Sequence, residues 1–368
     1  MSLQPKRGIG RLKICTHGGI NHAELKALGF TPEEVLDFSV STNPFMPPPG
    51  VREIMGAIPI EQYPDSEATE LKNRLSESLD VSPASILAGS GTTELIRLVV
   101  MAYFRKGNPV LILEPAYGEY EVASRIAGVR LVSHRSREED RFSPRMEEVT
   151  GLIKKTRPQA VFICNPNNPT GKYLSRTDIE AVLEAIGDNL LILDEAYIAF
   201  VTGSWNSIDL TARGNVVILR SMTKDYGLPG LRLGYALAHK EIIENIRRVC
   251  LPWNVNIIAQ KVGLAVLEQG EYLERSLLQV KEANKYLTDE ISRLGFTVLP
   301  SEANYFLVKV GNAGTCRSSL LKHGIMVRDC TSFGLPEYIR IAPRTLPECE
   351  KLVTALSSIL NSTEFADD

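Results

Sequence analysis

Three side chains that could take part in covalent and acid–base chemistry follow apolar runs of this chain. Asp194 ends the run LLILD, Tyr197 comes three residues later, and Lys224 follows the run VVILRS closely. Ligands of open α/β sheets bind at the carboxyl ends of the strands, so we expect the three side chains at one edge of a sheet. An amine, a carboxylate and a phenol at one edge would suit catalysis on a bound cofactor.

These groups match the needs of pyridoxal phosphate, which requires a lysine amine for its Schiff base and an acid partner for its pyridine nitrogen. We expect Lys224 to supply the amine and Asp194 to keep the nitrogen protonated, so that the ring draws electrons from the substrate. Asn168 and Tyr197 can hydrogen-bond the 3-oxygen of the ring, and Tyr117 can stack on its face.

A phosphate site is predicted beside the ring. The sequence GSGTTE (89–94) opens a helix with small residues whose backbone amides can approach an anion, and an arginine offers a permanently charged fork. The residues that we expect around the phosphate are Gly91, Thr92, Thr93, Ser221, Thr223 and Arg232.

The motifs Asn-Pro-x-Asn-Pro-Thr-Gly (165–171), Asp-Glu-Ala-Tyr (194–197) and Ser-x-x-Lys (221–224), in this order, resemble fold-type I pyridoxal-phosphate enzymes, the aspartate-aminotransferase-like group. The resemblance covers nearly the whole chain. It implies that Arg340 grips the α-carboxylate of the substrate. It also implies a homodimer, in which Tyr63 reaches the cofactor phosphate of the neighbouring subunit.

Two further segments bear on the substrate. His-Gly-Gly (17–19) and Arg-Asp-Cys-Thr-Ser-Phe-Gly-Leu (328–335) resemble threonine-phosphate decarboxylases of cobalamin synthesis. This resemblance implies decarboxylation of L-threonine O-3-phosphate to 1-amino-2-propanol phosphate and carbon dioxide. The residues that it places at the substrate, besides Asn168 and Arg340, are His17, Arg328 and Arg344.

Two other functions stay open at this point. The first alternative is an aminotransferase acting on histidinol phosphate or an aromatic amino acid, because Tyr63 and Arg340 are shared with histidinol-phosphate aminotransferases, and Ser-Thr-Asn-Pro (41–44) departs from the Asn-Ile-Asn-Pro of many decarboxylases. The second is a non-catalytic relative that keeps the fold and binds an effector. The intact pair of Asp194 and Lys224 argues against the second alternative.

Helical and strand patterns alternate from about residue 68 to 240, and many of the strands are apolar throughout. This pattern is typical of a mainly parallel sheet, here mixed, that is sandwiched by helices. Beyond residue 240, long helical stretches and short strands indicate a smaller α+β unit. We expect an N-terminal segment (1–43) that joins the small unit, a large cofactor-binding domain (44–253) and a small C-terminal domain (254–368).

Composition excludes several classes of protein. The formal net charge of −3 comes without a basic block, so we expect neither nucleic acid nor a membrane surface as the main partner. The expected partner is a small phosphorylated amino acid or amino alcohol. Six scattered cysteines form no metal-binding spacing, so no metal site is predicted, and a reducing cytoplasm fits. The N-terminus lacks the apolar run of a signal peptide.

Overall fold

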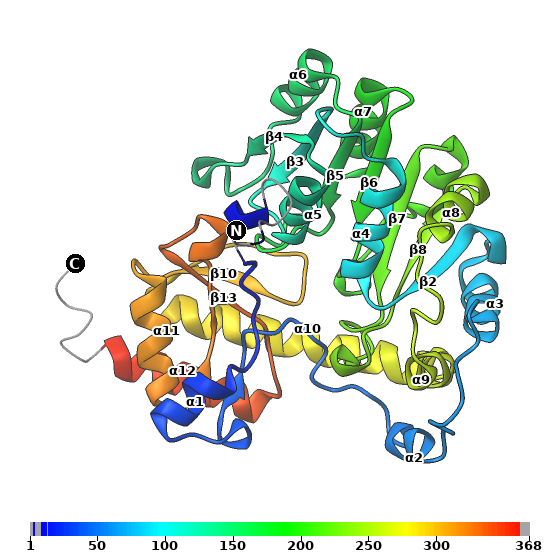
Figure 1. Ribbon diagram of the computed structural model, residues 1–368. Coiled ribbons are helices and arrows are strands. Elements are labelled where there is room, and N and C mark those ends of the chain that lie inside the picture. The colour runs from blue at the N-terminus through cyan, green and yellow to red at the C-terminus, as the bar shows by residue number, and fades with distance from the viewer. Residues whose placement is uncertain (1–2, 4–8, 13, 361–368) are drawn as a thin grey trace.

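The computed structural model describes residues 3, 9–12 and 14–360. The chain forms two units, and a seven-stranded sheet lies at the centre of the larger one (Figure 1). The strand order is β2-β8-β7-β6-β5-β3-β4. The sheet is mixed, because β8 runs antiparallel to both neighbours whereas β7, β6, β5, β3 and β4 are parallel. The strands are β2 (Ile86–Gly89), β3 (Pro109–Glu114), β4 (Arg130–Arg135), β5 (Ala160–Cys164), β6 (Leu190–Asp194), β7 (Val216–Ser221) and β8 (Gly234–Ala238).

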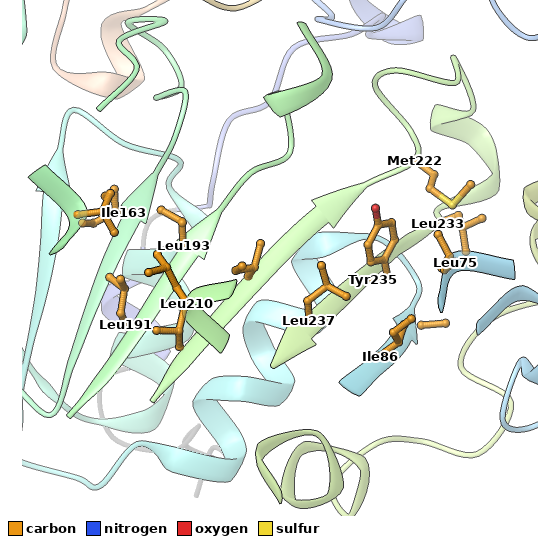
Figure 2. Packing of buried hydrophobic residues seen from close by; sticks show 14 of the residues in the cluster. Leu75, Ile86, Ile163, Leu191, Leu193, Leu210, Met222, Leu233, Tyr235 and Leu237 are labelled. Carbon is orange, nitrogen blue, oxygen red and sulfur yellow. The ribbon is translucent and has the colours of Figure 1, made fainter. Parts of the chain in front are cut away.

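Helices cover both faces of this sheet, which explains why its central strands are apolar throughout. In β6, Leu191 and Leu193 pack into the core on one face, and Ile192 between them packs into the core on the other. The first face, shown with Leu191, Leu193 and Leu237 in Figure 2, is covered by α3 (Thr69–Leu79), α6 (Met146–Thr156), α7 (Arg176–Ile186) and α9 (Ile257–Leu267). The second is covered by α4 (Thr92–Tyr103), α5 (Glu119–Ala127) and α8 (Lys240–Arg247).

The parallel strands bring the polar residues that come after them to one edge. In the register of the sheet, Cys164 pairs with Asp194, and Asp194 pairs with Leu219 of β7. Lys224 therefore leaves the sheet one strand away from Asp194, beyond the end of β7. The predicted α/β class with a mixed sheet is confirmed, and so is the meeting of these strand ends.

The smaller unit is built on an antiparallel sheet of order β12-β13-β10-β9. Its strands are β9 (Thr297–Val298), β10 (Phe306–Lys309), β12 (Arg328–Asp329) and β13 (Tyr338–Ile341), and its helices are α11 (Ala313–Lys322) and α12 (Leu346–Leu360). The N-terminal part of the chain packs here, since β1 (Leu36–Asp37) pairs with β11 (Ile325–Met326). The helix α1 (His22–Leu28) adds Leu25 to a small cluster beside β11.

The predicted boundary between the large domain (44–253) and the small domain (254–368) stays a prediction. The packing of the helices after residue 253 indicates where the chain passes from one unit to the other. The helix α9 lies after residue 254, yet Ala259, Val262 and Val266 pack into the core of the large unit, where α9 also contacts α2 (Val51–Gly56). The long helix α10 (Gly270–Arg293) leads from there to the small unit, whose core holds Leu287 and Ile291. The packing thus places the change of unit within α10.

Sequence patterns missed some elements because they are short or adjoin others. The strand β2 has only four residues, ILAG, and α8 follows β8 after one residue. Among the residues that the structure describes, none of the helices is both long and apolar enough to cross a membrane.

Candidate active site

A cleft of about 940 Å³ opens at the carboxyl edge of the seven-stranded sheet, between the two units and the N-terminal segment. Its lining joins residues from distant parts of the sequence. The predicted site residues that line it are His17, Thr92, Thr93, Tyr117, Asn168, Asp194, Tyr197, Ser221, Thr223, Lys224, Arg232, Arg328 and Arg340. The structure therefore brings together most of the residues that the sequence marked for the cofactor and the substrate.

Asp194, the last residue of β6, lies at the bottom of this cleft with only 3% of its surface exposed. Its Oδ2 accepts a hydrogen bond of 2.7 Å from the Tyr120 hydroxyl, and its Oδ1 accepts one of 3.0 Å from the Ala196 amide. Burial raises the pKa of Asp194 to about 6, although both hydrogen bonds act in the opposite direction. A cationic partner such as a protonated pyridine nitrogen would offset that burial.

Lys224 lies beside Asp194, with its Nζ 5.7 Å from the ring centroid of Tyr197. Withdrawal from water and the positive charges of Arg340 and Arg232 together lower the pKa of Lys224 to about 8, against the pull of Asp194. A lysine with a lowered pKa holds more neutral amine, which is the form that attacks a carbonyl carbon. The site thus prepares Lys224 for a covalent bond to an aldehyde.

The start of α4 and the end of β7 form a cradle for an anion. Gly91 precedes α4 with φ +78°, and a Cβ at this position would lie 2.7 Å from Nη2 of Arg232. Only glycine allows this conformation and this approach. The hydroxyls of Ser221 and Thr223 lie 2.8 Å apart and are buried next to it. Backbone amides, hydroxyls and a guanidinium are the donors that bind a phosphate.

Aromatic and amide groups complete the part of the cleft that would hold a ring. The Tyr117 hydroxyl lies 3.0 Å from Oγ1 of Thr93, so the tyrosine side chain is tied to the start of α4. The buried Tyr197 packs edge to face on Tyr305, with ring centroids 4.8 Å apart. Together with Asp194, Lys224 and the cradle, these residues fit pyridoxal phosphate, which when bound supplies an electron sink for the bonds of the substrate Cα.

Two buried arginines also line the cleft. Arg340 of β13 donates hydrogen bonds to Oδ1 of Asn168 and, at 2.9 Å, to the carbonyl of Ser39, and its guanidinium carbon lies 4.8 Å from the ring centroid of Tyr305. Arg328 of β12 donates to the Thr16 carbonyl and to Oγ of Ser332, both at 2.7 Å. These contacts fix two positive charges where a substrate with anionic groups would bind.

Three predicted residues lie outside the lining of the cleft in the described part of the chain. Arg344 is turned away, because its Nη2 forms an ion pair of 2.7 Å with Glu348. Tyr63 is 77% exposed and stacks on Trp253, with ring centroids 4.4 Å apart, and it does not line the cleft of its own chain. Gly91 does not line the cleft directly, but it lies against the guanidinium of Arg232, which does. The expectation for Arg344 therefore finds no support in this arrangement.

Sequence reasoning missed Tyr120, whose hydroxyl bonds Asp194, and Glu119, whose carboxylate lies 3.6 Å from Nε2 of His17. Both stand in the first turn of α5, directly after Tyr117. The spacing Tyr-x-x-Tyr was the one available signal, since residues three apart around a helix start share a side. Ser39 was missed because it acts through its backbone carbonyl, which no residue type reveals.

Comparison with known proteins agrees with this geometry. The family model for aminotransferase class I and II matches residues 33–356, and the chain belongs to this family. The predicted cofactor, pyridoxal phosphate, is confirmed by this membership. A histidinol-phosphate aminotransferase of Thermoanaerobacter pseudethanolicus is 34% identical over 312 residues, which cover 84% of this chain and 88% of the relative.

Solved structures show the same fold. The histidinol-phosphate aminotransferase of Sinorhizobium meliloti, in complex with pyridoxal 5'-phosphate, is 23% identical with a TM-score of 0.88, and the match covers 98% of both chains. The L-threonine-O-3-phosphate decarboxylase of Porphyromonas gingivalis is 26% identical with a TM-score of 0.78, and the match covers 88% of this chain and 99% of that one. The aspartate-aminotransferase-like fold is thereby confirmed.

Proposed function

We propose that this chain uses pyridoxal phosphate to decarboxylate L-threonine O-3-phosphate. The observation that carries the proposal is the position of the two segments that resemble threonine-phosphate decarboxylases. Both line the cleft: the first through His17 and Gly18, and the second through Arg328, Ser332 and Phe333. Arg328 of the second segment also donates a hydrogen bond to the carbonyl of Thr16, the residue just before the first segment.

The charges of the cleft support a substrate with two anionic groups. Arg340, held by Asn168 and Ser39, would bind the α-carboxylate, and Arg328 with His17 would bind the phosphate. A phosphate held at a fixed point gives leverage on the Cα substituents, so that the Cα–carboxylate bond can stand perpendicular to the ring plane. Lys224, which lines the same cleft, would return a proton to Cα after carbon dioxide leaves.

Transamination of histidinol phosphate is the second candidate, and the names of the relatives favour it. The relative from Thermoanaerobacter pseudethanolicus, at 34% identity, is a histidinol-phosphate aminotransferase. In such a reaction Arg328 or Arg340 would bind the phosphate, and a keto acid with two carboxylates would use both arginines in the second half of the cycle. The same two positive charges thus serve either chemistry.

A set of four incubations separates the two candidates. Purified protein with pyridoxal phosphate is given threonine phosphate or histidinol phosphate, each with and without 2-oxoglutarate, while carbon dioxide and glutamate are measured. Decarboxylation predicts carbon dioxide from threonine phosphate without any acceptor. Transamination predicts glutamate from histidinol phosphate, with strict dependence on 2-oxoglutarate. Lys224→Ala protein is the control for reactions of the free cofactor.

The active form that we propose is a homodimer. Tyr63 lies on the surface beside Trp253, and Ile60 and Leu251 nearby in the sequence are also exposed, at 76% and 70%. Exposed apolar side chains that form a contiguous patch are typical of a surface that contacts another chain. A second copy of the chain would cover them and would receive Tyr63 at its own cofactor phosphate.

A further inference from the structure

A thiol, an imidazole and a carboxylate meet where the N-terminal segment lies against the start of α5, at the wall of the cleft. The Sγ of Cys15, a ring nitrogen of His17 and a carboxylate oxygen of Glu119 all lie within 4.8 Å of one another. Sequence spacing gave no sign of this cluster, because Glu119 comes from α5 and the other two residues from the N-terminal segment. The expectation of no metal site rested on short-range spacing alone.

The N-terminal segment is held in place between its two cluster residues and just after them. Arg328 donates a hydrogen bond of 2.7 Å to the carbonyl of Thr16, which lies between Cys15 and His17. Farther along, the Gly19 amide donates one of 2.8 Å to Oγ of Ser39. The thiol of Cys15 packs against Gly118, where a Cβ would lie 2.6 Å from the sulfur. The close approach of the sulfur to the start of α5 therefore depends on this glycine.

Glu119 offers one oxygen toward the cluster. Only 6% of its surface is exposed, and Arg97 binds its Oε2 at 2.8 Å. The other oxygen, Oε1, lies 3.6 Å from Nε2 of His17. This separation is about the edge of a tetrahedron of ligands around a zinc ion, whose bonds to nitrogen and oxygen are roughly 2.0–2.2 Å long. Arg97 would orient the carboxylate, as second partners of metal ligands do.

We propose that Cys15, His17 and Glu119 form a binding site for Zn²⁺. A thiolate and an imidazole select borderline-soft ions of this kind, and a site with oxygen ligands alone would be needed for Mg²⁺ or Ca²⁺. The three protein ligands leave a fourth position for water or an anion from the cleft. The bound ion would join the N-terminal segment to α5 and so close a loop of about a hundred residues.

The test is direct titration of the full-length protein, loaded with pyridoxal phosphate, with Zn²⁺ in a calorimeter. We expect one Zn²⁺ per chain, together with slower amide hydrogen exchange in residues 14–19. Cys15→Ser and His17→Ala should each weaken binding by about a hundredfold or more, since even the second partners of metal ligands are worth tenfold to a hundredfold. Co²⁺ should give thiolate-to-metal absorption in the wild type and lose it in Cys15→Ser.

The matched control is Cys250→Ser, because Cys250 is another partly buried free thiol and does not line the cleft. This variant should bind Zn²⁺ like the wild type, and excess Mg²⁺ should not displace the ion. The proposal is wrong if the wild type binds no Zn²⁺, if Cys15→Ser and His17→Ala keep wild-type affinity, or if Cys250→Ser loses it. His17 is exposed, so its variant also guards against loss of binding through misfolding.

Discussion

Asp194 and Lys224 shift each other's pKa in the cleft, because each charge favours the charged form of the other group. The burial that raises the pKa of Asp194 to about 6 also lowers that of Lys224 to about 8, and each charge partly offsets the cost of the other. A bound cofactor would pair with both groups. The carboxylate of Asp194 would contact its ring nitrogen, and the amine of Lys224 would bond to its aldehyde carbon. Cofactor binding is therefore favoured, because it would give each of these two buried groups a partner.

Replacement of Lys224 by alanine should abolish turnover while the fold remains, because only the amine is lost. Borohydride treatment of the loaded wild type should fix the cofactor to Lys224, as peptide mass mapping can verify. Lys240→Ala, at an exposed lysine that begins α8, is the control and should retain full activity. Recovery of the label at another lysine would refute the assignment.

The pH at which the cofactor attaches should depend on Arg340. Its positive charge lowers the pKa of Lys224, so Arg340→Met should raise that pKa above about 8 and leave less neutral amine at a given pH. The midpoint of the rate of cofactor attachment, followed by absorbance from pH 6.5 to 10 (about the range that spans this pKa), should therefore move upward. Arg248→Met, at an exposed arginine after α8, should leave the midpoint where it is.

Tyr120→Phe should weaken cofactor binding by roughly tenfold to a hundredfold, the worth of one hydrogen bond to a charged group. The hydroxyl bonds Oδ2 of Asp194 at 2.7 Å and lowers its pKa, so its loss raises that pKa further. The carboxylate is then protonated at a higher pH, and the acid limb of cofactor affinity should shift upward. Tyr103→Phe, at a hydroxyl bonded to Asn245, is the control. An unchanged acid limb would contradict this role.

At the scale of elements, the ends of the apolar strands were the most informative feature of the sequence. Asp194 and Lys224 could be found because each comes after an apolar run, and parallel strands bring such ends together. Glu119 could not be found, because its role depends on the N-terminal segment lying against α5, a contact between distant parts of the chain. Arg344 shows the converse. A motif drew attention to it, yet its guanidinium forms an ion pair with Glu348, an acidic residue four positions later.

The turn η8 (Thr331–Phe333) links the two units through a single side chain of β4. Arg135 donates hydrogen bonds of 2.8 and 2.9 Å to the carbonyls of Phe333 and Gly334. The same turn carries Ser332, which bonds Arg328. Arg135 thus positions an arginine of the cleft without touching it.

Arg135→Ala should raise KM for the phosphorylated substrate by roughly two- to tenfold, the worth of an ordinary hydrogen bond, and change kcat much less. The reason is that η8 loses its anchor while the cofactor residues stay in place. Steady-state kinetics and hydrogen exchange of residues 331–334 would measure both effects. Arg137→Ala, two residues along and paired with Glu139 on the surface, should do neither.

At the scale of the whole molecule, the proposed dimer makes a clear prediction. Lys224→Ala and Tyr63→Phe subunits, each inactive or impaired alone, should regain activity when mixed after unfolding and refolding together. In a heterodimer, one of the two sites then receives the intact lysine from one chain and the intact tyrosine from the other. A mixture no more active than its parts would mean that each site is built from one chain.

The pairing of β1 with β11 also sets an order of events during synthesis. Leu36 can pair with Ile325, and Phe38 can accept the hydrogen bond of the Ala342 amide, only after residues 325–342 have left the ribosome. The sheet of the large unit, whose strands lie close to one another in the sequence, can form earlier. Residues 14–43 are thus placed after the large unit that follows them in the sequence, and the cleft gains this wall only once the small unit has been made.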